Sequence, residues 1–402
     1  MSHPAGTVTI DRSRSPEPSS LSLLCWLAAR GAAVCAVLGF VLLVSVAVTP
    51  AGRIAAIALL GAGAWPVLLT QAWVRRDRRW LRGGVACGLL VLVLVGELVR
   101  RAPPGDTGIG GRVSAVHSGS VGSFRRLSPA NLVPEVDQLM CCFTVMALVD
   151  PLFGWRQSAE LKSWTAQLYS ELEGDSAFAR LPSAMPSVYG ELLGMSPQPG
   201  HAWVYIPPGL NRTMPAPVLV FFHGSGGNFK GYLWVLSKVA DRLGMVLVSP
   251  SFGAGNWRLP QAEAAFDFAL QAAAKSTTIE SKNIHVVGLS NGGLAVSQLA
   301  SVRGAQLRSV IFLSPVFDGE RLGSAGFALQ CMAKPVLVLT GAEDDRVPLG
   351  YVESAVAILA GAGAIPTLEV VPGANHFLLF SHRDRAVGAL GDWLAANGVS
   401  AW

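Results

Sequence analysis

Residues 283–303 read Asn283-Ile-His-Val-Val-Gly-Leu-Ser-Asn-Gly-Gly-Leu-Ala-Val-Ser-Gln-Leu-Ala-Ser-Val-Arg303. The β-branched run at 284–287 predicts a buried strand, and the apolar spacing that follows predicts a helix. Between them the pattern Gly-x-Ser-x-Gly puts Ser290 on a sharp turn, where Gly288 and Gly292 let the strand and helix approach closely. A helix that starts beneath the serine points free N–H groups at a developing negative charge. We predict a nucleophilic serine here; the alternative is a Gly/Ser turn that only tightens a strand–helix joint.

Strands and helices alternate through the rest of the C-terminal half. Apolar or alternating runs predict strands at 201–207, 216–223, 245–249, 308–314, 334–340 and 367–371. Helical patterns lie between and after them, at about 229–243, 261–275, 351–360 and 377–395. This alternation predicts the α/β class, with a mostly parallel sheet covered by helices on both faces.

A serine hydroxyl is a poor nucleophile until a base accepts its proton. His376, in Pro372-Gly-Ala-Asn-His-Phe377, follows the last predicted strand and precedes the last helix, so its imidazole is placed at the carboxyl edge of the sheet. We predict that it is the base, against the alternative of a helix N-terminal histidine without a catalytic role. Of the other histidines, His285 is predicted to lie in the core and His382 to be solvated.

The base needs a carboxylate to hold its tautomer. Gly341-Ala-Glu-Asp-Asp-Arg-Val-Pro348 follows a predicted strand, and the spacing Gly-x-x-Asp-x-x-Val-Pro selects Asp344. Its neighbour Asp345 stays open as an alternative, and Asp318 is a more remote one. Ser290, Asp344 and His376 then follow one another in the order nucleophile, acid, base.

An oxyanion hole requires two backbone N–H groups aimed at the developing charge. One is predicted to be the amide of Asn291, next to the serine. The other is expected in the loop His223-Gly-Ser-Gly-Gly-Asn228, at the amide of Ser225. A phosphate-binding role for this loop is disfavoured, because no Gly-Lys-Ser/Thr follows it.

Residues 200–397 resemble an α/β-hydrolase in four motifs: the His-Gly-x-Gly-Gly loop, Gly-Leu-Ser-Asn-Gly-Gly, Gly-x-x-Asp-x-x-Val-Pro and Gly-x-x-His. The Ser-Asn-Gly-Gly form is similar to predicted esterases of the polyhydroxybutyrate-depolymerase and feruloyl-esterase type. Prolyl-oligopeptidase-like peptidases share much of the pattern. The resemblance implies a Ser–His–Asp mechanism through an acyl-enzyme, a small or polymeric ester substrate, and neither a metal nor an organic cofactor. The segment between the strands at 308–314 and 334–340 is too short for a large lid domain.

Two other functions remain open. The same triad serves serine peptidases and acyltransferases, and the sequence does not separate these from an esterase. A hydrolase-like domain that has lost catalysis and serves as a membrane-bound binding module is the second alternative. The intact set of four motifs argues against that module, since drift breaks such motifs.

The N-terminal hundred residues have a different composition. The 402-residue chain is 51% hydrophobic and only 14% charged, and most of this imbalance lies before residue 101. After a polar tail predicted to be disordered at 1–20, the membrane region at 21–101 holds three apolar runs, at 31–49, 54–74 and 83–99. Each run is about long enough to cross a bilayer as a helix. We therefore predict a multi-pass membrane protein.

The short loops predict the orientation. Residues 75–82 carry five arginines, whereas the loop between the first two runs has only Arg53. The positive-inside rule places the arginine-rich loop in the cytoplasm, and three crossings then put the hydrolase domain outside it. If the third run, with Glu97 near its end, did not span, the domain would be cytoplasmic.

The remaining features concern the linker, the cysteines and the charge. Residues 102–134 are rich in Gly, Ser and Pro and are predicted to be a linker before a domain at 135–402, in which 143–153 covers part of the surface. Cys141 or Cys142 could bridge to Cys331, although buried thiols are favoured. The net charge of +5 comes from arginines beside the apolar runs, and no basic stretch is interleaved with aromatics, so nucleic acid is not an expected partner.

Overall fold

The structure is a computed structural model that describes residues 20–104, 111–118, 126–196 and 200–399. The chain divides into two compact units, Met1–Arg100 and Arg101–Trp402, and each is described by itself. The predicted tail at 1–20 lies outside the described residues except for Ser20, where the first helix begins.

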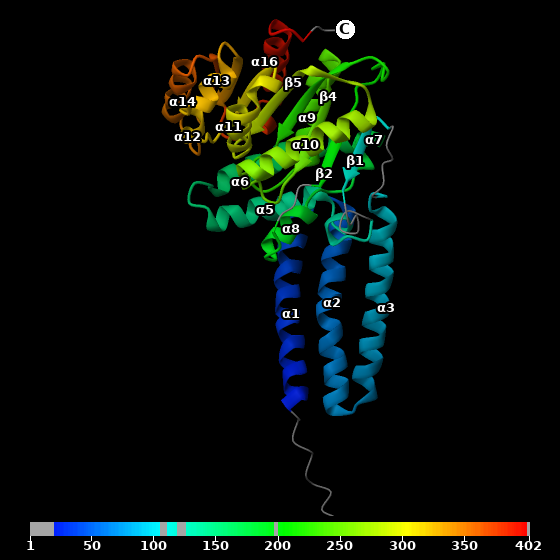
Figure 1. Cartoon of the computed structure of the whole chain (residues 1–402). Helices are drawn as coiled ribbons and strands as arrows, with labels where there is room; N and C mark the ends of the chain where they lie inside the picture. Colours follow the sequence, from blue (N-terminus) through cyan, green and yellow to red (C-terminus); the bar gives the residue numbers. More distant parts are fainter. Residues whose placement is uncertain (1–19, 105–110, 119–125, 197–199, 400–402) are drawn as a thin grey trace, which may run out of the picture. The chain divides into compact units, whose positions relative to one another are not determined.

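The first unit consists of three helices, drawn in blue to cyan in Figure 1: α1 (Ser20–Val46), α2 (Pro50–Arg75) and α3 (Arg78–Arg101). All three are long and apolar enough to cross a membrane, with hydropathies of 2.3, 1.7 and 1.9 over their most apolar windows. The three helices begin earlier in the chain than the apolar runs predicted from the sequence. Arginine is compatible with a helix, so an uncharged run marks only the apolar part of each helix. The break between α1 and α2 is set at Thr49, whose side chain accepts a hydrogen bond from Gly52 N at 2.9 Å and precedes Pro50 at the first helical turn.

Small residues let these helices pack closely. A Cβ atom built on Gly63 of α2 would lie 2.3 Å from the Cβ of Ala36 in α1. One on Gly88 of α3 would lie 2.9 Å from Nε1 of Trp65 in α2. Close approach at small residues is typical of helices that associate within a bilayer.

The second unit is built on an eight-stranded sheet with the order β1-β2-β4-β3-β5-β6-β7-β8. Strands β1 and β2 pair antiparallel, as do β2 and β4, and the other neighbours are parallel. This is the α/β-hydrolase fold. The strands are β1 (Val113–His117), β2 (His201–Tyr205), β3 (Ala216–Phe222), β4 (Val246–Ser251), β5 (Ile279–Leu289), β6 (Ser309–Leu313), β7 (Pro335–Gly341) and β8 (Ile365–Val371).

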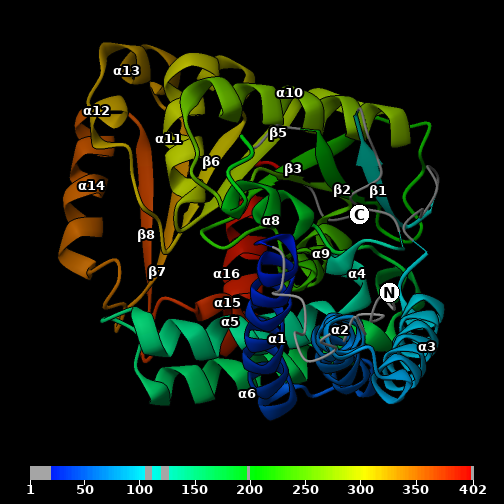
Figure 2. The same ribbon diagram turned by 90° about the horizontal axis from the view of Figure 1, so that it is seen from below.

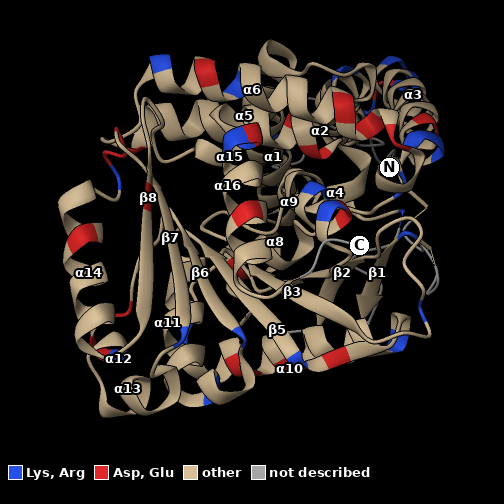
Figure 3. Ribbon diagram, turned by 90° about the horizontal axis from the view of Figure 1, so that it is seen from above, with Lys and Arg blue, Asp and Glu red and all other residues tan. Residues whose placement is uncertain are grey.

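Helices cover both faces of the sheet (Figures 2 and 3). One face carries α10 (Leu259–Ser276), α11 (Gly292–Arg303), α12 (Gly319–Leu322), α13 (Ala325–Cys331) and α14 (Leu349–Gly361), together with a 3-10 turn at Gly304–Gln306. The other face carries α9 (Lys230–Leu243), α15 (Leu378–Ser381) and α16 (Arg383–Ala396). The strands are buried between these layers as apolar runs, which is why the sequence shows few alternations in β3 and β7.

Among the described residues, five helices connect β1 to β2 along the chain. They are α4 (Pro129–Leu132), α5 (Glu135–Val149), α6 (Trp155–Gly174), α7 (Ser176–Ala179) and α8 (Pro186–Leu192). The buried carboxylate of Glu135 accepts hydrogen bonds from Tyr169 Oη at 2.5 Å, Ser183 Oγ at 2.8 Å and Lys230 N at 2.7 Å. These bonds join α5, α6 and the start of α9, so one buried acid fixes this helical segment to the helix α9.

The predicted linker at 102–134 is wrong in part. Val113–His117 forms the edge strand β1, in register with β2, and α4 follows. A five-residue strand flanked by Gly and Ser has too short an apolar pattern to stand out. His117 lies in β1 with its ring 4.9 Å from that of His201.

The other histidines and the cysteines are placed as follows. His285 is buried in β5, as predicted, with its ring nitrogens 2.6 Å from Ser309 Oγ and 2.9 Å from Asn283 Oδ1. His382 lies between α15 and α16 and is half-buried rather than solvated, with Nδ1 2.9 Å from Ser381 Oγ. Cys331 is buried, whereas Cys142 is exposed on α5, so the prediction of buried thiols fails at that position.

Candidate active site

Ser290 stands on the turn between β5 and α11. Its φ is +49°, a left-handed conformation that costs a non-glycine residue free energy. Two backbone hydrogen bonds hold it there: Ser290 N donates to Leu313 O at 3.0 Å, and Val316 N donates to Ser290 O at 2.9 Å. The neighbouring strand β6 and its following loop therefore fix the strained turn.

The glycines of the turn are required by packing. A Cβ on Gly288 would lie 2.4 Å from the carbonyl oxygen of Gly292, and one on Gly292 would lie 2.1 Å from that of Phe222 in β3. Real Cβ atoms do not approach this closely, so both positions must be glycine for strand and helix to meet as they do.

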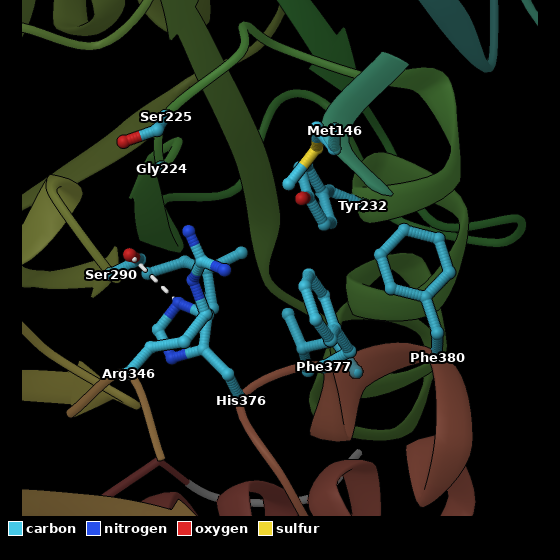
Figure 4. Close-up of a pocket in the computed structure, with 11 residues that line it drawn as sticks. Met146, Gly224, Ser225, Tyr232, Ser290, Arg346, His376, Phe377 and Phe380 are labelled. Atoms are coloured by element: carbon cyan, nitrogen blue, oxygen red, sulfur yellow. Dashed lines mark hydrogen bonds between the residues drawn. The ribbon is translucent and has the colours of Figure 1, made fainter. Parts of the chain in front are cut away.

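His376 reaches the serine from the loop after β8. Its Nε2 lies 3.0 Å from Ser290 Oγ, the contact drawn as a dashed line in Figure 4. The loop crosses close to the end of β7, where a Cβ on Gly341 would lie 2.2 Å from Ala374 O. A glycine at the end of β7 thus makes room for the segment that carries the histidine.

Asp344 completes the arrangement. Its Oδ2 and Oδ1 lie 2.9 and 3.2 Å from His376 Nδ1. Oδ1 also accepts hydrogen bonds from the amides of Arg346 at 3.0 Å and Val347 at 2.8 Å, and the carboxylate is completely buried. Because an ionised carboxylate only accepts, Nδ1 carries the imidazole proton and Nε2 is free to accept the proton of the serine hydroxyl.

The two alternative acids point elsewhere. The exposed carboxylate of Asp345 accepts a hydrogen bond from Gln157 Nε2 at 3.2 Å. Asp318 caps α12, accepting from Arg321 N at 3.1 Å, and also accepts from Gln298 Nε2 at 3.1 Å. Of the three candidates, the structure brings only Asp344 to His376.

The two amides predicted for an oxyanion hole are available. Asn291 is the N-cap of α11, at the positive end of a twelve-residue helix. Within the described part of the chain, neither the amide of Asn291 nor that of Ser225 has a hydrogen-bond acceptor. The Ser225 loop passes beside the serine, since a Cβ on Gly224 would lie 3.1 Å from Ser290 Cβ.

His223 has a structural role that no sequence motif indicates. Its ring is buried at the start of this loop, where Nε2 accepts from Phe252 N at 3.1 Å and Nδ1 lies 2.8 Å from Gly224 O. Its carbonyl accepts from Trp257 Nε1 at 2.9 Å. Burial lowers the pKa of His223 to about 4, so the ring is neutral near pH 7 and donates from Nδ1. His223 thus holds the Gly224 carbonyl, and with it the loop before Ser225; only its place in the loop could have signalled this.

The serine and histidine open into a cavity of about 110 Å³ (Figure 4). Its walls combine aliphatic and aromatic side chains with polar groups, and Arg346 is its permanently charged residue. The cavity is lined by Met146, Gly224, Ser225, Tyr232, Leu289, Ser290, Arg346, His376, Phe377, Leu379 and Phe380. Among the described residues, no group of three or more His, Cys, Asp or Glu side chains is arranged to hold a metal ion.

No protein-family model and no curated protein sequence matches the chain. Solved structures do resemble it. An esterase from the Planctomycetes species Thermogutta terrifontis, Est2 with propionate bound, is 18% identical, with a TM-score of 0.42, over 50% of this chain and 90% of that one. The same esterase phosphorylated by paraoxon gives 18% identity and a TM-score of 0.41 over 50% and 89%. Est1E from Butyrivibrio proteoclasticus gives 19% identity and a TM-score of 0.40 over 49% and 93%.

Proposed function

We propose that the chain is a serine hydrolase that cleaves carboxylic esters, with Ser290 as nucleophile, His376 as general base and Asp344 as the acid that orients the base. The observation that carries this proposal is the continuous series of hydrogen bonds from Ser290 Oγ through His376 to the buried carboxylate of Asp344. A hydroxyl held against a neutral imidazole in the correct tautomer is the arrangement that activates serine in unrelated hydrolases.

Acylation follows from this geometry. As Oγ attacks the ester carbonyl carbon, its proton moves to His376 Nε2, and the imidazolium is stabilised by Asp344. The carbonyl oxygen becomes an oxyanion, which accepts hydrogen bonds from the amides of Ser225 and Asn291. When the tetrahedral intermediate collapses, the C–O bond to the alcohol breaks and His376 returns the proton to the leaving alkoxide. The acyl group stays on Ser290 as an ester.

Deacylation repeats these steps with water. His376 takes a proton from a water molecule, whose oxygen attacks the acyl carbon and forms a second tetrahedral oxyanion. Its collapse breaks the bond to Oγ, and the proton passes from His376 to the serine. The carboxylic acid is released and the enzyme returns to its starting state.

The shape of the cavity favours an ester over a peptide. It is small and lined by Tyr232, Phe377 and Phe380, which suits one short apolar acyl group better than several residues of an extended chain. A panel of p-nitrophenyl esters beside aminoacyl-anilides tests this. We expect hydrolysis of the short acyl esters; cleavage of the anilides at comparable kcat/KM would instead favour a peptidase.

We also propose that α1–α3 anchor the enzyme in a membrane and that the hydrolase domain lies outside the cytoplasm. Length and apolar composition support the anchoring. The five arginines in residues 75–82 support the orientation, because positively charged loops stay on the cytoplasmic side.

A further inference from the structure

The second half of α5 and the turn after it carry large apolar side chains that are exposed to solvent. Leu148 is 67% exposed and Val149 is 72% exposed, and Val145, Leu152 and Trp155 are exposed as well. We call these five residues the α5 patch. No charged residue occurs between Asp137 and Asp150, so this half of α5 presents no charged group to solvent. A contiguous exposed apolar surface marks a place of contact with another body.

The α5 patch is continuous with the wall of the active-site cavity. Met146, the neighbour of Val145, lines the cavity. The ring of Phe153, beneath the patch, lies 5.7 Å from that of Phe377, which also lines it. Arg346 Nη2 donates to Asp150 Oδ2 at 2.6 Å, which ties the turn to the loop that holds Asp344. The sequence predicted that 143–153 covers the domain; in fact Phe143 and Phe153 do so, while the patch between and beyond them faces outward.

A smaller apolar surface lies at the end of α8. Leu192, Leu193 and Met195, at the end of α8, are exposed. Helix α8 packs against the loop at residues 223–228, where a Cβ on Gly227 would lie 2.6 Å from Val188. It is also joined to α5 by a hydrogen bond from Tyr189 Oη to Gln138. The two apolar surfaces therefore belong to neighbouring helices, α5 and α8, which lie at one end of the second unit (Figures 1 and 2).

The short segment between α3 and β1 indicates that the α5 patch contacts the membrane. Only residues 102–112 separate Arg101, at the end of the apolar α3, from Val113, the first residue of β1. At about 3.3–3.6 Å per residue, that segment spans at most roughly 40 Å, so an anchored hydrolase domain stays beside the bilayer. Trp155 at the edge of the patch is the kind of side chain that settles at a membrane–water interface.

We propose that the α5 patch docks on the lipid bilayer and that the active site hydrolyses esters dissolved in that bilayer, such as short-chain acyl esters of lipophilic alcohols. This deepens the function proposed above and rests on it, including the membrane anchor. Docking brings the cavity mouth to the lipid phase, so an acyl chain enters from the bilayer without crossing water.

The test uses the full chain reconstituted in phosphatidylcholine vesicles. Two butyrate esters are compared: water-soluble p-nitrophenyl butyrate, and a fluorogenic butyrate whose long-chain alcohol holds it in the bilayer. The patch variant is Leu148→Ser with Val149→Ser. The control is Leu329→Ser, since Leu329 is 81% exposed on α13, before β7 begins and thus at the sheet edge opposite the site. Rates are normalised to the outward-facing enzyme that a fluorophosphonate labels.

We expect the patch variant to lose about tenfold on the bilayer ester, because two aliphatic side chains no longer bury against lipid, and to keep the rate on the soluble ester within about twofold. The control keeps both rates. Equal rates for patch variant and wild type on the bilayer ester would overturn docking, and so would equal losses on both substrates. Failure of the wild-type chain on both esters would instead overturn the proposed function.

Contact with lipid is measured directly by quenching of tryptophan fluorescence with brominated phosphatidylcholine. Trp155→Phe is expected to remove part of the quenching. The matched control is Trp393→Phe, because Trp393 Nε1 bonds Thr367 Oγ1 near the start of β8, at the sheet edge away from the site. Equal quenching in wild type and Trp155→Phe would overturn docking, as would cross-links that join two chains through the patch.

Discussion

His376 Nδ1 lies 2.9 Å from Asp344 Oδ2, while the adjacent carboxylate of Asp345 turns outward to Gln157. Two consecutive acids thus occupy different environments, one buried against the imidazole and one in solvent. This difference separates a group that sets the tautomer of the base from one that does not.

Asp344→Asn is therefore expected to lower kcat by on the order of 10⁴, because an amide favours the wrong imidazole tautomer and leaves the imidazolium unstabilised. Asp345→Asn, the matched control, is expected to change kcat by less than about twofold. Steady-state hydrolysis of p-nitrophenyl butyrate measures both. If the two severities are reversed, the acid has been assigned to the wrong residue.

Gly288→Ala is expected to prevent the turn from forming. Its Cβ would lie 2.4 Å from Gly292 O. Because that oxygen belongs to the backbone, no side-chain movement relieves the clash, and we expect loss of folding or a destabilisation of several kcal/mol. Gly388→Ala in α16 is the control, since a Cβ there meets nothing within 4 Å. Alanine in a helix interior stabilises by about 0.5–1 kcal/mol relative to glycine. Thermal melting of the two variants should move in opposite directions, and equal shifts would contradict the packing argument.

The hydrolase domain is expected to lose stability as the pH falls from about 6.5 to 4. Burial lowers the pKa of His223 to about 4, and burial together with Arg308 lowers that of His285 to about 3. The folded state therefore stays neutral at these rings while the unfolded chain takes up protons below its ordinary pKa of about 6.5. The stability is fully present above pH 6.5 and declines below it, by roughly 3 kcal/mol for His223 at the acid end.

His285→Gln isolates this effect, because glutamine does not titrate and the acidic side chains are unchanged. Urea unfolding of the full chain at pH 7 and at pH 4.5 measures the free energy of unfolding. The variant should lose less of it between the two pH values than wild type does. An identical loss in both proteins would show that His285 does not stay neutral in the folded domain.

The sequence predicted the elements that chemistry constrains most tightly. Ser290, Asp344 and His376 follow strands of the parallel sheet, so their order and spacing gave both the fold and the residues that the structure brings together. Two parts could not be predicted. Strand β1 is too short and too closely flanked by Gly and Ser to show a period. It forms by pairing with β2, where His117 pairs with His201, 84 residues further along the chain. The buried bonds of Glu135 and His223 depend on partners far along the chain, which no local pattern encodes.

The orientation in the membrane is tested by reporter fusions after Ala102. Alkaline phosphatase is expected to be active there, and a fluorescent protein that folds only in the cytoplasm should stay dark, because the arginine-rich loop at 75–82 keeps to the cytoplasmic side. The opposite pair of results would mean that only two of the three helices span and that the enzyme works inside the cell.

Labelling with a fluorophosphonate tests the central claim most directly, since it reports whether Ser290 is an activated nucleophile without reference to any substrate. Wild-type chain should be labelled stoichiometrically, with the adduct mapped to the peptide that holds Ser290. Ser290→Ala should melt like wild type, take no label, and lose on the order of 10⁶ in kcat on p-nitrophenyl butyrate. Labelling that persists in Ser290→Ala, or a wild-type chain that folds but takes no label, would contradict the account.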